Sequence, residues 1–202
     1  MARRKQIGRR VEGWKAKSWY KVYAPDSFEK TYIGDTISGN PENVMGRVMQ
    51  TTLGEMTQDY SKQSIKMRFR INNVAGDAAY TEFVGHEVTR DYLRALVKRR
   101  TSRIDSIVLA TTNDGKKVRL TITCLTLSRA NISQVHAIRK LITDQLVQTA
   151  SKMDFESFVK EIVSGDAARE LFKNIKLIYP VRRVDIIKSR LEEAAVLTPI
   201  TA

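Results

Sequence analysis

The sequence predicts an α+β protein with a mainly antiparallel, barrel-like β core, flanking helices and a basic N-terminal extension. Runs in which apolar and polar residues alternate, joined by short turns, fill most of the chain before residue 127 and predict strands. From residue 132 the apolar residues recur with the period of a helix. The chain of 202 residues, 42% of them hydrophobic, is long enough to bury a core.

The first 21 residues carry a strong positive charge. They hold eight Arg and Lys side chains against one Glu, in a chain whose net charge is +13. Such a segment buries too little apolar surface to order by itself, so we predict that residues 1–17 are partly disordered and bind a polyanion. For Trp14 the sequence leaves two alternatives, burial in the core and stacking on an unpaired base. Trp19 and Tyr20 are expected to enter the core with the following strand.

The first strand is predicted at residues 20–24, where Pro25 ends it. After a stretch punctuated by glycine and proline, residues 44–56 predict a strand interrupted at Gly46 or, alternatively, a short helix. Both alternatives place apolar residues of this segment in the core.

A strand with two unlike faces follows at residues 64–72. Every second position is apolar: Ile65, Met67, Phe69 and Ile71. Three of the intervening positions are basic: Lys66, Arg68 and Arg70. We therefore predict one buried face and one basic face, whose charges are either neutralised by acids on neighbouring strands or available to RNA.

The next strands are predicted at residues 79–88 and 101–112. Residues 113–116, Asn-Asp-Gly-Lys, predict a hairpin turn because Asp-Gly tolerates the positive φ that tight turns require. The returning strand alternates as far as Cys124 and changes phase at Leu125, which predicts a bulge. Cys124 is the single cysteine, so it forms no disulfide within the chain and is expected to be a small buried hydrophobe.

Three helices are predicted in the C-terminal third of the chain. The first covers residues 132–152. Its apolar stripe comprises Val135, Ile138, Ile142, Leu146 and Met153. Asp154 is expected to cap the second helix, which Gly165 ends, and Asp166 to open a short third one.

A final pair of strands is predicted around Pro180, within another basic segment. The remaining residues, 192–202, are predicted to be a flexible tail. No linker interrupts the chain between the extension and this tail, so residues 18–191 are predicted to form a single α+β RNA-binding domain.

Residues 89–105 hold six Arg or Lys side chains and two Asp. Thr89 is a suitable N-cap for a helix that ends near Lys98 or Arg99. One arc of this helix is apolar: Tyr92, Leu93, Leu96 and Val97. The opposite side is basic: Arg90, Arg94 and Lys98. We expect the apolar arc to pack and the basic ridge to face phosphates.

Catalysis is not expected. His86 and His136 have no second ligand at metal-binding spacing, and the chain has no glycine-rich phosphate loop. The acids that a metal-dependent nuclease would use are scattered: Glu82, Glu87, Asp91, Asp105 and Asp114. We therefore predict no catalytic or metal-binding residue, no cofactor and no small-molecule substrate. No apolar run of 18 residues occurs, so a cytoplasmic protein without a membrane partner is expected.

Five segments in order carry a resemblance to a known family: TYIGDTISGNP, MGRVMQTTLGEMTQD, FVGHEVTRDYLRALVKRRTSRID, TTNDGKKVRLTI and QVHAIRK. Together they closely resemble the archaeal and eukaryotic small-subunit ribosomal protein family called three-A-e, also named the e-type protein one. The resemblance runs from about Gly13 to Arg190, and the compact length resembles the archaeal members.

The resemblance implies a structural ribosomal protein without catalytic residues. It implies a place on the platform of the small subunit, beside the exit of the mRNA channel and the 3' end of the small-subunit rRNA. The implied partners are that rRNA, neighbouring platform proteins and, as a further candidate, mRNA at the channel exit. An extraribosomal regulator that binds single-stranded RNA is the alternative function, and a nuclease is a third.

Charge and aromatic content select the candidate RNA-binding residues within this family segment and the extension. They are Arg3, Arg4, Lys5, Arg9, Arg10, Trp14, Lys15, Lys17, Lys66, Arg68, Arg70, Arg90, Arg94, Lys98, Arg99, Arg100, Arg103, Arg182 and Arg183.

Overall fold

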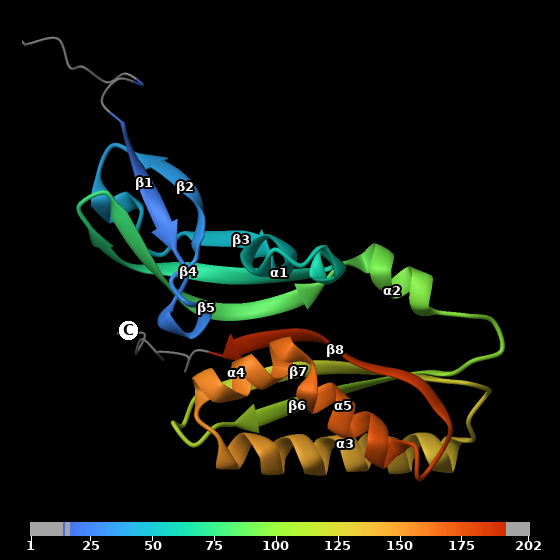
Figure 1. Cartoon of the computed structure of the whole chain (residues 1–202). Helices are drawn as coiled ribbons and strands as arrows, with labels where there is room; N and C mark the ends of the chain where they lie inside the picture. Colours follow the sequence, from blue (N-terminus) through green and yellow to red (C-terminus); the bar gives the residue numbers. More distant parts are fainter. Residues whose placement is uncertain (1–13, 15–16, 193–202) are drawn as a thin grey trace, which may run out of the picture. The chain divides into compact units, whose positions relative to one another are not determined.

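The computed structural model describes residue 14 and residues 17–192, which form eight strands and five α-helices (Figure 1). The strands are β1 (Ser18–Tyr23), β2 (Tyr32–Ser38), β3 (Val48–Thr52), β4 (Ile65–Ala75), β5 (Ala78–Val88), β6 (Arg103–Thr111), β7 (Lys117–Thr126) and β8 (Val181–Glu192). The helices are α1 (Leu53–Thr57), α2 (Arg90–Leu96), α3 (Ile132–Lys152), α4 (Phe155–Ser164) and α5 (Asp166–Ile175). The predicted α+β class is confirmed.

The chain divides into two compact units. The first comprises residues 1–49 and 69–83, and the second comprises residues 50–68 and 84–202. Strands β4 and β5 each contribute residues to both units. The single domain over residues 18–191 stays a prediction, as does the barrel-like core. Among the described strands β2 pairs only with β1 and β6 only with β7, so no closure of the sheet is seen.

In the first unit β1 lies between two partners. It pairs antiparallel with β2 and parallel with the beginning of β5, where Val22 lies opposite Ala79. The core of this unit comprises Tyr20, Val22, Val44, Ile71 and Ala79. Tyr20 is buried as predicted, but the prediction for Trp19 is wrong, because its side chain is 59% exposed. Successive side chains of a strand point to opposite faces, so the burial of Tyr20 directs Trp19 to solvent.

The second unit is built around β7, which pairs antiparallel with β6 on one side and β8 on the other. The predicted hairpin between β6 and β7 is confirmed, with Gly115 at a φ of +74°. The predicted bulge is confirmed as well, since the register between β7 and β8 shifts between Leu125 and Thr126. Helix α3 packs against β6 and α5 against β8, and α4 contacts both helices (Figure 1).

The three C-terminal helices occur where the sequence predicts them. Three other elements differ from the prediction. The predicted pair of strands around Pro180 is a single strand, β8, because residues before Pro180 complete the stripe of α5 with the buried Ile175. Helix α2 ends at Leu96, earlier than predicted, because Val97 has an extended backbone. Finally, a strand, β2, occupies part of the segment in which only turns were expected.

Candidate nucleic-acid interface

Helix α2 and the loop that follows it present a group of exposed cations, which we call the α2 basic group. Its members are Arg90, Arg94, Lys98, Arg99 and Arg100. Within residues 17–192, only Arg94 of this group has an acidic partner, Asp91, at 3.9 Å. Both side chains of that pair are at least 80% exposed, so the pair is weak. The group therefore keeps almost all of its positive charge in solvent.

Two further candidates, Arg182 and Arg183, hold α2 from strand β8. Arg182 donates from Nη1 to the carbonyl oxygen of Leu96 at 3.4 Å, which is one of the carbonyls that a helix end leaves unpaired. The guanidinium of Arg183 lies 5.3 Å from the centre of the Tyr92 ring, within the range of a cation–π contact. These two arginines thus position the helix that carries the α2 basic group.

Arg183 is also held by Asp185, whose carboxylate lies 2.7 Å from the guanidinium Nε. Partial burial disfavours the charge of Arg183, but the hydrogen bond and the charge of Asp185 outweigh it and raise the pKa of Arg183. Burial raises the pKa of the neighbouring Tyr92 hydroxyl, and the negative charge of Asp185 adds to that shift. Arg183 is therefore charged and is held by two partners, Asp185 and the Tyr92 ring.

The basic face of β4 is only partly available. Lys66 is exposed and has no acidic partner within the described chain. Arg68 lies 2.8 Å from Glu87 of β5, which also has Lys188 at 3.6 Å. Arg70 is half-buried and has a partner in the chain. Of the two alternatives predicted for the basic face of β4, neutralisation by an acid on a neighbouring strand thus holds for Arg68. Lys66 remains the strongest candidate for RNA binding on this strand.

Residues Trp14 and Lys17 are the described part of the N-terminal candidates. Trp14 is 67% exposed, and the Nζ of Lys17 lies 4.9 Å from the centre of its ring. An exposed aromatic ring beside a cation is a surface on which a base can stack. The other predicted candidates of the extension lie outside the described residues: Arg3, Arg4, Lys5, Arg9, Arg10 and Lys15.

Arg103, the remaining candidate, lies at the start of β6. Its Nε is 3.0 Å from a carboxylate oxygen of Asp105, which also accepts the hydroxyl hydrogen of Thr123. Asp105 therefore has two partners and reduces the net positive charge at this position. Arg103 is thereby a weaker candidate than the α2 basic group.

His86 is a structural residue. Its side chain is buried, with Nε2 at 3.1 Å from the carbonyl oxygen of Ile186 and Nδ1 at 2.6 Å from the hydroxyl of Ser189. Because the carbonyl can only accept, Nε2 donates and the Ser189 hydroxyl donates to Nδ1. Burial lowers the pKa of His86, and the hydrogen bond to the Ile186 carbonyl and the charge of Glu87 oppose this shift only partly. The imidazole is therefore neutral and has no nitrogen left for a ligand.

Within the described part of the chain, no group of three or more His, Cys, Asp or Glu side chains could hold a metal ion. Burial raises the pKa of Cys124 to about 12, so its thiol stays protonated and unreactive. None of the helices that the structure describes is long and apolar enough to cross a membrane.

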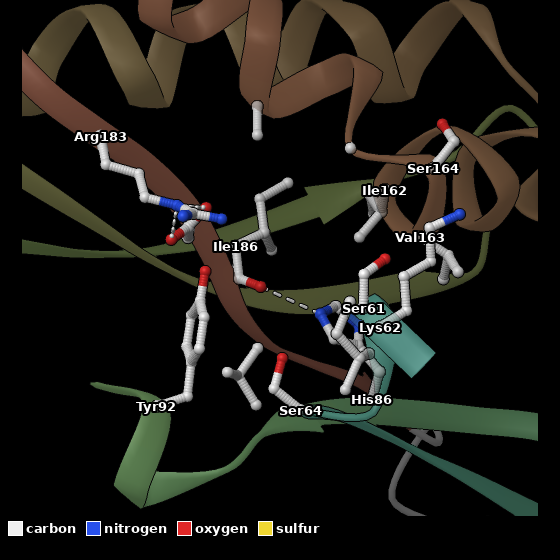
Figure 2. Close-up of a pocket in the computed structure, with 15 residues that line it drawn as sticks. Ser61, Lys62, Ser64, His86, Tyr92, Ile162, Val163, Ser164, Arg183 and Ile186 are labelled. Atoms are coloured by element: carbon white, nitrogen blue, oxygen red, sulfur yellow. Dashed lines mark hydrogen bonds and ion pairs between the residues drawn. The ribbon is translucent and has the colours of Figure 1, made fainter. Parts of the chain in front are cut away.

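The second unit contains a cavity of about 440 Å³ that the sequence does not predict. Four separate segments line it, and Figure 2 shows Tyr92 and Arg183 on one side, Ile162 to Ser164 on the other and His86 below. No single segment carries a recognisable motif for it. The one available signal was Tyr92, an aromatic residue within a strongly basic helix.

Comparisons with known proteins show the family of the chain. The model of the ribosomal S3Ae family matches residues 5–195. The small ribosomal subunit protein eS1 of Methanoculleus marisnigri is 65% identical over 195 residues, which cover 96% of this chain and 99% of the relative. The protein of the same name from Methanoregula boonei is 63% identical, covering 96% and 97%. That of Methanobrevibacter smithii is 44% identical, covering 94% and 98%.

These archaeal relatives match the chain over almost its whole length, across both compact units. The chain belongs to the ribosomal S3Ae family, a family of structural, non-enzymatic ribosomal proteins.

Proposed function

We propose that this protein binds the rRNA of the small subunit on the platform, near the exit of the mRNA channel and the 3' end of that rRNA, in the cytoplasm. It supports assembly of the subunit and translation. Neighbouring platform proteins are further partners, and mRNA at the channel exit is another. The observation that carries the proposal is the α2 basic group, five exposed cations on and after one short helix with a single weak acidic partner among the described residues.

The proposed mechanism is neutralisation of phosphates by a positioned surface. Each Lys or Arg that contacts a phosphate releases counterions, and this contribution depends little on sequence. Arg182 and Arg183 hold α2 to β8, so its cations start from a defined position. Lys66 and the cations of the N-terminal extension provide further contacts, and several surfaces engaged at once raise the affinity.

Charge removal on α2 tests the proposal. Replacing Arg94, Lys98 and Arg99 together by Ala should reduce the slope of log K against log salt for rRNA binding by about two to three units. The matched control removes three exposed lysines from other helices: Lys140, Lys160 and Lys173. The control should keep the wild-type slope. Equal slopes for both triple variants would show that only net charge matters, and α2 would be excluded from the interface.

Sedimentation of the tagged chain from an archaeal lysate tests the ribosomal role. The protein should migrate with the small subunit at equal stoichiometry after a high-salt wash, and the bound RNA should be small-subunit rRNA. Migration near the top of the gradient with many different RNAs would instead favour the extraribosomal regulator of single-stranded RNA.

A further inference from the structure

The cavity of the second unit has the size of a ligand site. Its volume of about 440 Å³ lies within the range of about 300–1,000 Å³ typical of pockets that bury small molecules. Its lining comes from the segment before β4 and the first residue of that strand, from β5 and α2, from the junction of α4 and α5, and from β8. All of these residues belong to the same compact unit.

The walls of the cavity are mainly apolar. Each of the four lining segments contributes aliphatic side chains: Ile65, Val88, Ile162, Val163 and Ile186. Tyr92 and the Arg183 guanidinium, in cation–π contact, close one side and offer flat surfaces (Figure 2). Flat aromatic and guanidinium groups are the surfaces on which proteins stack unpaired bases.

The polar groups of the cavity suit an anionic ligand. Ser64 points its hydroxyl toward the cavity, and within residues 17–192 this hydroxyl has no hydrogen-bond partner (Figure 2). A free hydroxyl both donates and accepts, so it can pair with the edge of any base. The lining contains two cations, Lys62 and Arg183, and one carboxylate, Asp185, which Arg183 already neutralises. The other cation, Lys62, has a weak partner, because its Nζ lies 3.6 Å from the carboxylate of Asp59 and both side chains are partly exposed.

We propose that this cavity receives one unstacked nucleotide of the bound RNA. The proposal rests on the proposed rRNA binding and deepens it. The base lies among the aliphatic walls, stacked on the side formed by Tyr92 and Arg183, with its edge at Ser64, and its phosphate lies at Lys62. Tyr92 connects the cavity to the α2 basic group, because it belongs to the same helix as Arg90 and Arg94. A strand whose phosphates follow α2 can therefore turn one base into the cavity.

A cavity-filling variant tests this assignment without changing any charge. Ala168 lines the cavity from α5, so Ala168→Phe fills part of the space. The matched control is Ala137→Phe on the exposed surface of α3. We expect Ala168→Phe to weaken binding to protein-free small-subunit rRNA about tenfold, the effect of losing one stacked base, with an unchanged salt slope. Ala137→Phe should bind as the wild type does. Thermal unfolding of both variants confirms that each is folded.

Three outcomes of this experiment have distinct meanings. Wild-type affinity of a folded Ala168→Phe variant would overturn the nucleotide site. Wild-type affinity for rRNA combined with loss of incorporation into the subunit would assign the cavity to a neighbouring protein, which also overturns it. Failure of the wild-type chain to bind rRNA would overturn the proposed function, whereas the titration below would still test the cavity.

A titration of the unmodified protein is independent of any variant. The probes are the four nucleoside 5'-monophosphates, with ribose 5-phosphate as the control that lacks a base. Amide resonances of Ser64, Tyr92 and Gly165 should shift more with a nucleotide than with ribose 5-phosphate, which supplies only the phosphate contact at Lys62. Equal shifts with ribose 5-phosphate, or no shift at the cavity with any nucleotide, would show that the cavity does not bind a base and would overturn the proposal.

Discussion

Gly85 is a position at which strand β5 tolerates no side chain. A Cβ atom at this residue would lie 2.2 Å from the carbonyl oxygen of Ser189 and 3.3 Å from the Cα of Arg190, which is the partner of Gly85 on β8. The obstacle is backbone, so it cannot move away as the end of a flexible side chain could. The close approach also aligns the next residue, His86, with Ser189.

We expect Gly85→Ala to lower the free energy of unfolding by at least about 2 kcal/mol, because an added methyl group forces β5 and β8 apart. Urea unfolding measures this change. Gly39→Ala is the matched control, since a Cβ there meets nothing within 4 Å, and it should change the free energy by less than about 0.5 kcal/mol. Similar losses in the two variants would contradict the close-approach argument.

His86 makes the stability of the fold depend on pH. In the unfolded chain an imidazole gains its proton near pH 6.5, whereas burial lowers the pKa of His86 in the folded state. Between these two pKa values the unfolded state binds more protons, so stability decreases as the pH falls below about 6.5. Above that pH the contribution of His86 is fully present.

We therefore expect the free energy of unfolding to fall between pH 7 and pH 5, and to fall less in His86→Gln, whatever the overall stability of that variant. Urea unfolding at the two pH values measures the difference. The control, His136→Gln on the exposed surface of α3, should keep the wild-type loss. A wild-type loss in His86→Gln as well would assign the pH dependence to the carboxylates.

Helix α4 shows how an element can receive its cap from a distant turn. The sequence predicts Asp154 as the cap, and Asp154 is the N-cap residue, but its side chain makes no capping hydrogen bond. The carboxylate of Asp114, in the turn between β6 and β7, accepts from the N–H of Phe155 at 2.9 Å. Lys116 of the same turn lies over the Phe155 ring at 4.6 Å. The hairpin turn and the helix thus stabilise each other.

We expect Asp114→Ala to lower the free energy of unfolding by about 1 kcal/mol, as loss of an N-cap does, and to expose the start of α4 to hydrogen exchange. Asp154→Ala should cost less, since its side chain provides no bond to the helix N–H groups. A larger effect for Asp154→Ala than for Asp114→Ala would contradict the cap seen in the structure.

At the scale of the whole molecule, the chain is linked by two strands that belong to both compact units. β4 and β5 each run through the boundaries between the units, at residues 68–69 and 83–84. The single domain over residues 18–191 remains a prediction that unfolding can test.

We expect one cooperative unfolding transition, with the same midpoint for fluorescence of the tryptophans, both in the first unit, and for helical circular dichroism of the second. Gly85→Ala should shift both midpoints together. Two separated midpoints would show that the units unfold independently, and the single domain would then be wrong.

Local patterns in the sequence predicted most of the elements. Alternation places Met67, Phe69 and Ile71 in the core and Lys66 in solvent, since it depends only on the geometry of a strand. The same is true of the stripe of α3, of which Ile138, Ile142 and Leu146 are buried. Predictions failed where two local patterns competed, as at Ile175, whose helical spacing from Leu171 prevailed over an apparent strand.

The sequence by itself determined the α+β class, the excess of positive charge, the basic stretch around α2 and the family resemblance, because each depends on composition or on neighbours along the chain. Only the tertiary structure decided which cations are neutralised, as Arg68 is by Glu87 and Arg183 by Asp185, and which remain in solvent. It alone assembled the cavity beside Tyr92 from four separated segments. Ion pairs and cavities depend on distances between residues far apart in the chain, and those distances are set only when the strands pair and the helices pack.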